Sequence, residues 1–319
     1  MRRLQGIRPF TVLSCDNVRE NGLVARAAVI GLAKARSTEL ATWIAQNVTF
    51  PCTMVDRIVP AVTEETLQLI ADQLGVFDPC GIACEPFRQW VIEDNFVNGR
   101  PEWDNVGAQF VEDVVPFEMM KLRMLNGSHS FLAYLGYLAG YETIADTMAN
   151  PEYRQSGVRK LMLNEQAPTL SMPEGTDLSG YADLLLSRFT NPSLRHRTSQ
   201  IAMDGSQKLP QRLLDPIRIH LAKGTDHRHL VLGVAGWMRY VRGLDDKGQK
   251  IDIVDPLLPA IRLSISSIIA RKNVYVRYWQ LSQFFCRDLP ENSSFVNAVM
   301  ETYVRLEQRG ARAVLESLQ

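Results

Sequence analysis

The pattern of the sequence changes near residue 117, and this change sets the expected fold. Residues 48–117 hold strand-like runs at 54–59 and 82–92, separated by prolines that interrupt regular backbone hydrogen bonding. Beyond residue 117 the sequence is mostly helical, with Pro or Gly between the segments. The expected helices cover residues 118–139, 152–166, 178–189, 197–222, 228–242, 257–271, 274–285 and 294–317, the last with a break near Gly310. The sequence therefore predicts a mainly α (α+β) protein with a multi-helical C-terminal domain.

The first 47 residues predict a different structure. Residues 10–15 read as a short buried strand that ends at Asp16 and Asn17, and apolar positions from Val24 to Leu32 then follow helical spacing. A strand, a turn and a helix make up one unit of an α/β sheet. Because a single unit leaves the edges of its sheet unpaired, residue 1 is not expected to be the natural start of the fold.

The composition argues against several kinds of partner. The 319 residues carry 35 basic and 35 acidic side chains, so neither nucleic acid nor a membrane surface is expected. No signal peptide is recognisable, and the apolar run near 130–141 is shorter than the roughly 20 residues that a membrane span needs. Five cysteines, an odd number, do not form a disulfide framework, which predicts a reducing cytoplasm.

Common metal and cofactor motifs are absent from the sequence. It holds no G-x-G-x-x-G, P-loop, G-x-S-x-G or H-E-x-x-H. Cys80 and Cys84 lack a second pair of ligands nearby, so two small buried residues are favoured over a zinc site. His227 and His229 follow Gly224 in a charged run and are expected to be solvated. No metal site is therefore predicted.

Residues 118–132 carry a mixture of polar side chains that allows two interpretations. In an α-helix at about 100° per residue, Glu118, His129 and Asn126 project about 60°, 80° and 140° from the direction of Lys121. The first interpretation is a solvated polar stripe. The second is a catalytic wall, because the stripe mixes an acid, an amine, an amide and an imidazole between strongly apolar flanks. Gly127 would permit another group to approach this helix closely.

The side chains of this segment suit one kind of chemistry. Burial disfavours the ammonium form of a lysine and lowers its pKa, so that it can act as a base near neutrality. A neighbouring amide or imidazole can donate a hydrogen bond to a developing alkoxide. Lys121, Asn126 and His129 therefore suit removal of a hydroxyl proton while a hydride leaves the same carbon. Phosphoryl and acyl transfer fit less well, because no nucleophile is evident.

Five segments of the chain resemble one protein family. Residues 121–130, K-L-R-M-L-N-G-S-H-S, resemble the signature of the polyol-specific long-chain dehydrogenases, the mannitol dehydrogenase family. The similarity continues in order with T-V-L-S-C-D-N at 11–17 followed by E-N-G at 20–22, F-P-C-T-M-V-D-R-I-V-P at 50–60, C-E-P-F-R-Q-W-V-I-E-D-N-F at 84–96, and D-G-S-Q-K-L-P-Q at 204–211. The resemblance implies that residues 1–47 are a remnant of a Rossmann-type coenzyme domain, its last strand and helix. It also implies that residues 48–319 form a catalytic domain like the C-terminal domain of the family.

The resemblance implies a role for each side chain of the catalytic wall. Lys121 is expected to be the general base that takes the hydroxyl proton during oxidation. Asn17 and Asn126 are expected to hold the oxygen that becomes the carbonyl, and His129 to bind and orient the substrate. Glu118 is expected to pass the proton to solvent.

The resemblance also implies the substrate and the coenzyme. It is closest to members that interconvert D-mannonate and D-fructuronate with NAD in hexuronate breakdown, without a catalytic metal. Asp56 is expected at the rim of the site, and Asn17 and Asp56 beside the coenzyme. The candidates for binding the substrate carboxylate are Lys208, Arg197 and Arg195, with Arg88 behind them. Another polyol or aldonate, and NADP in place of NAD, remain open.

The chain departs from the family pattern at its N-terminus. Family members carry a dinucleotide-binding domain with a glycine-rich turn, and this sequence has no such turn. The coenzyme-binding half is therefore expected to be largely absent, through truncation or because a second polypeptide supplies it. The chain alone is expected to show little or no turnover. An inactive remnant, acting at most as a binding module, is the alternative from a different class of function.

Overall fold

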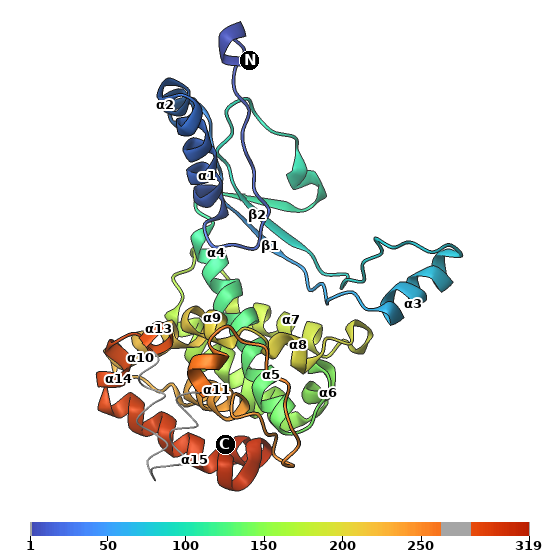
Figure 1. Ribbon diagram of the computed structural model, residues 1–319, viewed down its shortest axis with the longest axis vertical. Helices are drawn as coiled ribbons and strands as arrows, with labels where there is room; N and C mark the ends of the chain where they lie inside the picture. Colours follow the sequence, from blue (N-terminus) through green and yellow to red (C-terminus); the bar gives the residue numbers. More distant parts are fainter. Residues whose placement is uncertain (1, 263–281, 319) are drawn as a thin grey trace. The chain divides into compact units, whose positions relative to one another are not determined.

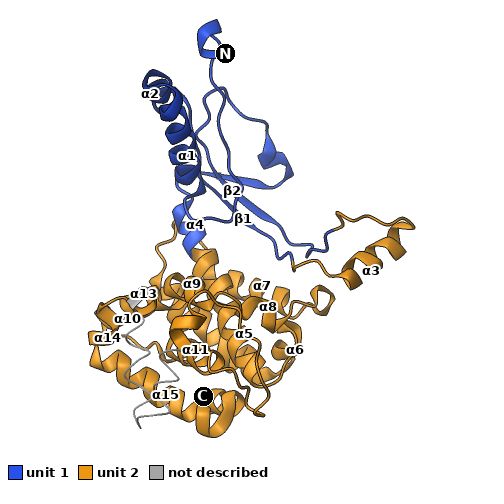
Figure 2. Ribbon diagram, in the orientation of Figure 1, with its two compact units in different colours: residues 1–59, 82–119 blue, residues 60–81, 120–319 orange. Residues whose placement is uncertain are grey.

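The computed structural model describes residues 2–262 and 282–318. The chain forms two compact units (Figure 2): unit 1 comprises residues 1–59 and 82–119, and unit 2 comprises residues 60–81 and 120–319. This division differs from the boundary expected after residue 47. The reason is that the strands between residues 53 and 111 pair with one another, and the first of them is hydrogen-bonded to the N-terminal segment through Thr53.

Unit 1 is built on a three-stranded sheet. Strand β1 (Thr53–Asp56) pairs antiparallel with β2 (Gln89–Glu93), and β2 pairs parallel with β3 (Ala108–Val111). Val91 and Ile92 of the central strand are fully buried. The other elements of the unit are η1 (Arg2–Gln5), α1 (Asn21–Arg36), α2 (Thr38–Asn47) and the 3-10 helix η2 (Trp103–Val106), and α1 packs against α2 (Figure 1).

The prediction of a strand at residues 10–15 is wrong. This segment is extended but not part of a ladder, because its bonds are isolated: Val12 N donates to Thr49 O at 3.0 Å, and Thr53 Oγ1 donates to Ser14 O at 2.7 Å. The strand-like runs expected at 54–59 and 82–92 shorten to β1 and β2. The helix expected around residues 24–32 is confirmed as part of α1.

The buried side chain of Asn21 fixes α1 to β1. Its Nδ2 donates to Thr53 O at 3.1 Å and to Asp16 O at 3.0 Å, and its Oδ1 accepts from Thr53 N at 2.9 Å. A buried amide without such partners would destabilise the fold. Because Asp16 precedes Asn17, the same bonds hold the start of the loop that carries Asn17.

Gly22 allows α1 to approach the chain before β1. A Cβ at residue 22 would lie 2.4 Å from Phe50 O and 2.8 Å from Cys52 N, which are backbone atoms. We expect Gly22→Ala to lower the free energy of unfolding by about 1–3 kcal/mol, the range typical of overpacking, as measured by urea denaturation. The control is Gly31→Ala in the same helix, where nothing lies within 4 Å of the added Cβ. Equal effects of the two substitutions would contradict this explanation.

Unit 2 is helical and is organised around two buried helices. Helices α5 (Ser128–Leu138) and α11 (Arg228–Tyr240) contact each other, and α15 (Ser293–Glu316) packs on α11 (Figure 1). The backbone of Gly310 inside α15 is non-helical, with φ 78° and ψ 163°, which confirms the predicted break. Other helices of the unit are α3 (Glu64–Leu74), α6 (Ile144–Ala149), η6 (Ala167–Thr169), α7 (Leu178–Phe189), η7 (Pro192–Leu194), α8 (Thr198–Ala202), α9 (Gly205–Leu209), α10 (Asp215–Lys223), α13 (Ser282–Phe285) and α14 (Asp288–Glu291).

Several segments of unit 2 are π-helices, in which each N–H bonds to the carbonyl five residues earlier. They are η3 (Lys121–Gly127), η4 (Glu152–Arg159), η5 (Leu161–Gln166) and η8 (Pro210–Leu214). Helix α4 (Val115–Met120) leads into η3, which continues into α5. The helix expected over residues 118–139 is therefore confirmed as one continuous helical run, but the α geometry assumed for residues 121–127 is wrong. η3 contacts both η5 and η8, which come from distant parts of the chain.

Two further helices expected from the sequence are divided into shorter segments. The expected helix at 152–166 consists of η4 and η5, and the one at 197–222 consists of α8, α9, η8 and α10. The expected helix at 274–285 and most of the one at 257–271 lie outside the described residues.

Candidate active site

Glu118 holds the loop that carries Asn17. Both of its carboxylate oxygens accept from the backbone N of Glu20, at 3.2 and 3.3 Å. Burial raises the pKa of Glu118, and the hydrogen bond from Glu20 partly opposes this effect. Asn17 itself is exposed, three residues before Glu20. The structure of unit 1 thus places the loop of one predicted site residue against the carboxylate of another.

Lys121 and Asn126 lie five residues apart in η3, and both residues are half-buried. In an α-helix, residues five apart point about 140° away from each other. In a π-helix, residue i+5 bonds to residue i and lies on the same side of the helix, as residue i+4 does in an α-helix. The arc expected from α-helical spacing is therefore wrong for this segment, and the π turn brings Asn126 towards the face of Lys121.

His129 is buried in the first turn of α5, directly after η3. Its ring lies 4.5 Å from the Phe189 ring and 5.2 Å from the His196 ring, between ring centroids. Burial lowers the pKa of His129 well below its usual value, and the charges of His196, Arg212 and Arg188 lower it further. Its Nε2 is buried and has no hydrogen-bond partner. At neutral pH the site therefore holds a neutral imidazole with one ring nitrogen available to a ligand.

The histidine pair predicts a loss of stability in acid. Burial lowers the pKa of His196 from 6.5 to about 4. The unfolded chain then binds more protons than the folded one between these values. The contribution of His196 to the free energy of unfolding should be fully present above pH 6.5 and fall by about 1.4 kcal/mol per pH unit below it. Urea denaturation near pH 7 and near pH 5 measures the change. His196→Asn should show a smaller acid loss, and an unchanged acid loss would contradict this account.

Four residues that surround η3 and His129 were not predicted from the sequence. Gln166 Oε1 accepts from Ser128 Oγ at 3.1 Å, and Arg212 Nη1 donates to Ser130 Oγ at 3.1 Å. The four residues are Phe189, His196, Gln166 and Arg212. The one signal in the sequence was Gly127, because a Cβ there would lie 2.6 Å from Gln166 Nε2.

Lys208 is half-buried at the C-terminal end of α9. Its Nζ donates to Met203 O at 2.6 Å. Burial lowers the pKa of Lys208, and the positive charge of Arg212, one helical turn later, lowers it further. Lys208 and the η3 segment are thus linked through Arg212.

Arg195 and Arg197 are exposed, and each faces a glutamate. Arg195 forms an ion pair with Glu65 of α3. Arg197 Nε lies 3.8 Å from Glu142 Oε1, and Arg197 lines a cavity of about 300 Å³. A substrate carboxylate at either position would compete with the glutamate.

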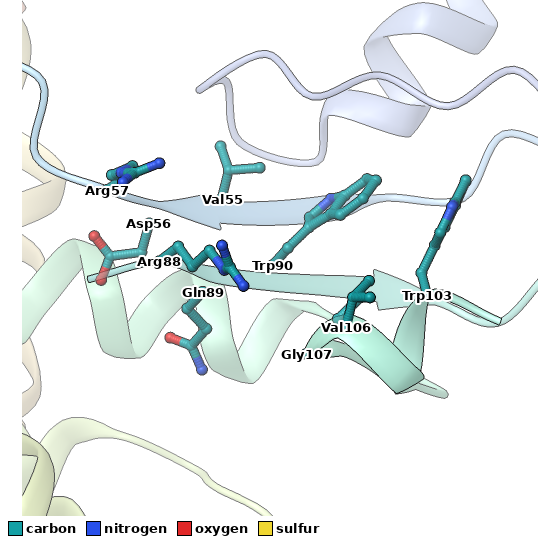
Figure 3. A pocket seen from close by; sticks show the side chains of 10 residues that line it. Val55, Asp56, Arg57, Arg88, Gln89, Trp90, Trp103, Val106 and Gly107 are labelled. Atoms are coloured by element: carbon teal, nitrogen blue, oxygen red, sulfur yellow. The ribbon is translucent and has the colours of Figure 1, made fainter. Parts of the chain in front are cut away.

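Asp56 lines a cavity of about 580 Å³ in unit 1 (Figure 3). The cavity also includes Arg88, a predicted site residue, and the stacked rings of Trp90 and Trp103, whose centroids are 5.1 Å apart. Figure 3 shows Asp56 at one end of this cavity and Trp103 at the other. Trp90 Nε1 is buried without a hydrogen-bond partner. The cavity therefore offers aromatic faces, a carboxylate and an unused donor.

The structure corrects two expectations about cysteines and histidines. Cys80 and Cys84 are free and exposed rather than buried, because they lie in the irregular loop after α3. His229 is buried rather than solvated, with its Nδ1 2.6 Å from Glu165 Oε1.

Within residues 2–262 and 282–318, no group of three His, Cys, Asp or Glu side chains is placed to hold a metal ion. In the same residues, no helix has both the length and the apolar character for crossing a membrane.

The chain matches two family models and several known proteins. The model of the mannitol dehydrogenase Rossmann domain matches residues 1–105, and that of the mannitol dehydrogenase C-terminal domain matches residues 113–307. D-mannonate oxidoreductase of Escherichia coli (strain K12) is 68% identical over 318 residues, which is 100% of this chain and 65% of that protein. Mannitol 2-dehydrogenase of Aspergillus fumigatus is 41% identical over 80% of this chain and 51% of its own length.

Solved structures agree with this assignment. The ternary complex of Pseudomonas fluorescens mannitol 2-dehydrogenase with NAD and D-mannitol is 37% identical, with a TM-score of 0.86, over 99% of this chain and 64% of that one. A substrate-free D-sorbitol dehydrogenase is 35% identical, with a TM-score of 0.88, over 98% of this chain and 64% of that one. The chain thus spans slightly less than two thirds of the length of these relatives.

One expectation about the N-terminal region is overturned by these matches. Because the Rossmann-domain model matches residues 1–105, the prediction that the coenzyme domain is largely absent is wrong, and residues 1–47 are not merely a remnant of it. The expectation of little turnover loses its basis. With both of its domain models matched along most of the chain, the protein belongs to the mannitol dehydrogenase family.

Proposed function

We propose that the protein is an NAD-dependent oxidoreductase that interconverts D-mannonate and D-fructuronate, the reaction of fructuronate reductase (D-mannonate oxidoreductase). The observation that carries this proposal is the high identity to D-mannonate oxidoreductase along the whole chain, well above the identity to mannitol 2-dehydrogenases. The reaction removes the proton of a hydroxyl group and a hydride from the carbon that carries this hydroxyl. The substrate is a small sugar acid.

Lys121 is the general base in this proposal. It is half-buried at the start of η3, and burial disfavours the ammonium form of a lysine. During oxidation its Nζ takes the hydroxyl proton as the carbonyl forms, and it returns the proton during reduction. A positioned base of this kind raises the reaction rate by about 10²- to 10⁴-fold.

Asn17, Asn126 and His129 act on the substrate oxygens. The amides of Asn17 and Asn126 donate to the oxygen that becomes the carbonyl, where negative charge develops. His129 orients the substrate through its buried, unpaired Nε2. The support for His129 is its low pKa, because a neutral imidazole can bind a hydroxyl group without adding a charge.

Glu118 passes the proton from Lys121 to solvent. It lies one turn before Lys121 in the same continuous helical run, and burial raises its pKa. A carboxyl whose proton affinity is raised in this way exchanges protons more readily near neutrality.

NAD accepts the hydride when it is bound. Asn17 and Asp56 are the residues of this chain proposed to lie beside it. The cavity that Asp56 lines, about 580 Å³ with two stacked indole rings, has room for a planar ring of the coenzyme. No metal is proposed, because the proton and hydride steps do not require one.

The substrate carboxylate distinguishes an aldonate from a polyol. Lys208, Arg197 and Arg195 are the proposed partners, in that order. Lys208 comes first because its Nζ donates to a neutral carbonyl, that of Met203, whereas each arginine already faces a glutamate. An ammonium with no carboxylate partner gains more from a carboxylate ligand.

Another substrate within the family is the alternative. The relatives named mannitol 2-dehydrogenase, and the solved mannitol complex, favour a polyol as the second candidate. An altronate (tagaturonate) enzyme is the third. We place the protein in the cytoplasm because its five cysteines are free, and we propose neither nucleic acid nor membrane as a partner.

A substrate panel tests the proposal. Purified protein is mixed with NAD or NADP and with D-mannonate, D-mannitol or D-altronate, and formation of the reduced coenzyme is followed by absorbance. We expect D-mannonate with NAD to give the highest kcat/KM. A higher kcat/KM with D-mannitol would favour the polyol alternative, and no reduction with any of the three would reject an oxidoreductase of this class.

A further inference from the structure

Arg212 of η8 joins the end of η3 to the start of α5. Its Nη1 donates to Asn126 O at 3.4 Å and to Ser130 Oγ at 3.1 Å. Asn126 lies near the end of the π-helix, and Ser130 lies in the first turn of the α-helix. A single guanidinium therefore spans the point where the helix changes from π to α geometry.

The position of the Arg212 charge is unfavourable unless its two hydrogen bonds have a function. The Nε of Arg212 is buried and has no hydrogen-bond partner. Burial lowers the pKa of Arg212 to about 10, so it is still protonated at neutral pH. Its acceptors, a carbonyl and a hydroxyl, are neutral. Among the described residues, neither hydrogen bond of this half-buried guanidinium goes to a carboxylate. Removing a cation from water without an anionic partner costs free energy, so we infer that the two bonds have a role.

Gln166 contacts the same junction from the other side. It is fully buried at the end of η5, and its Oε1 accepts from Ser128 Oγ at 3.1 Å. Gly127 lies close to both Gln166 and Arg212, because an added Cβ would be 2.6 Å from Gln166 Nε2 and 3.1 Å from Arg212 O. The η5 and η8 segments thus enclose the residue at which η3 ends.

The geometry of the junction decides where Asn126 points. Residues five apart lie on the same side of a π-helix, whereas they diverge by about 140° in an α-helix. If residues 121–127 relaxed to α geometry, the Asn126 side chain would turn away from the face of Lys121. π-helical turns are rare and are less favourable than α turns without added support.

We propose that Arg212 and Gln166 are positioning residues that hold residues 121–127 in π-helical form and so keep Lys121 and Asn126 on one face of the helix. Neither residue touches the reacting atoms in this proposal. The effect on catalysis rests on the proposed function, whereas the effect on the helix does not.

Arg212→Met tests the proposal, because it keeps the length of the side chain and removes both hydrogen bonds. We expect hydrogen exchange of the peptide covering residues 121–127 to become faster. We also expect kcat for D-mannonate oxidation to fall about 10- to 100-fold, the cost of a small misplacement of catalytic groups, with little change in KM. Arg212→Lys, which can reach one of the two acceptors, should restore part of kcat.

Three further variants make the outcome decisive. Arg218→Met, in the neighbouring α10, removes an arginine that pairs with Asp288, and it should leave both readouts unchanged. If Arg212→Met does not fold, Gln166→Met provides the same test from η5. Lys121→Ala separates the two claims: full activity in that variant would reject the assignment of the base, while hydrogen exchange would still decide the positioning.

The results that overturn the proposal are specific. Unchanged exchange of residues 121–127 in both Arg212→Met and Gln166→Met would reject the holding role. Faster exchange with unchanged kcat, in a protein whose activity depends on Lys121, would reject the link to catalysis. A loss of kcat that Arg218→Met reproduces would show a general effect of packing.

Discussion

Lys121→Ala is expected to lower kcat for NAD-dependent oxidation of D-mannonate by about 10²- to 10⁴-fold, the usual contribution of a general base. The reason is that no other side chain of η3 can accept the hydroxyl proton: the remaining polar groups of this helix are an amide and a guanidinium. Steady-state kinetics with saturating substrate measures the loss. KM should change much less, because the amine acts mainly in the transition state.

The matched control is Lys223→Ala, which removes an exposed lysine at the end of α10. It should leave kcat and KM unchanged. A small amine added to Lys121→Ala should restore part of the rate, since it can take the place of the missing base. Activity of Lys121→Ala equal to that of the unchanged protein would remove Lys121 from its role.

Glu165→Ala is expected to lower the free energy of unfolding by about 3–5 kcal/mol, the cost of breaking a buried polar cluster. Glu165 is buried, and its carboxylate accepts from His229 N at 2.9 Å and from Leu230 N at 2.8 Å. These are orphan donors of the first turn of α11, whose N-cap residue His227 provides no side-chain cap. The carboxylate thus caps α11 from another part of the chain.

Urea denaturation measures this effect, with Glu174→Ala, at an exposed position, as the control. Glu165→Gln should fall between the two, because an amide oxygen can accept one of the bonds but carries no charge for the helix dipole. A change in Glu165→Ala as small as that in Glu174→Ala would show that α11 does not depend on this cap.

The helical half of the fold could be predicted from the sequence because local signals decide it. The break at Gly310, the turn at Gly224 after α10 and the apolar run of α5 all follow from residue types within a few positions. The strand expected at residues 10–15 failed for the opposite reason. An apolar run favours an extended segment, but a strand also needs a partner strand from elsewhere in the chain. In the described residues, the backbone N of Val12 donates a single bond, to Thr49 O, and no ladder follows.

The residues proposed for the candidate site come from the sequence, but the geometry of the site could not be predicted. The mixture of Lys121, Asn126 and His129 between apolar flanks indicated a site. The π form of η3 could not be predicted, because it is associated with contacts to Arg212 and Gln166, which are remote in the sequence. The same is true of His196, which meets His129 only in the folded chain.

The error about the coenzyme domain has a different origin. The sequence lacks a glycine-rich phosphate-binding turn, and one missing motif was taken as the absence of a domain. A family model uses the whole pattern of residues, and it recognises Rossmann-domain sequence across residues 1–105. In the structure, the bonds between Asn21 and Thr53 join α1 to the sheet of the same unit.

Transfer of deuterium from substrate to coenzyme tests the central claim most directly. D-mannonate carrying deuterium at the carbon whose hydroxyl is oxidised is incubated with the protein and NAD, and the reduced coenzyme is analysed by mass spectrometry. The account predicts reduced coenzyme that carries one deuterium and forms more slowly than from unlabelled D-mannonate. Reduced coenzyme without deuterium, or none at all while D-mannitol is oxidised rapidly, would contradict it.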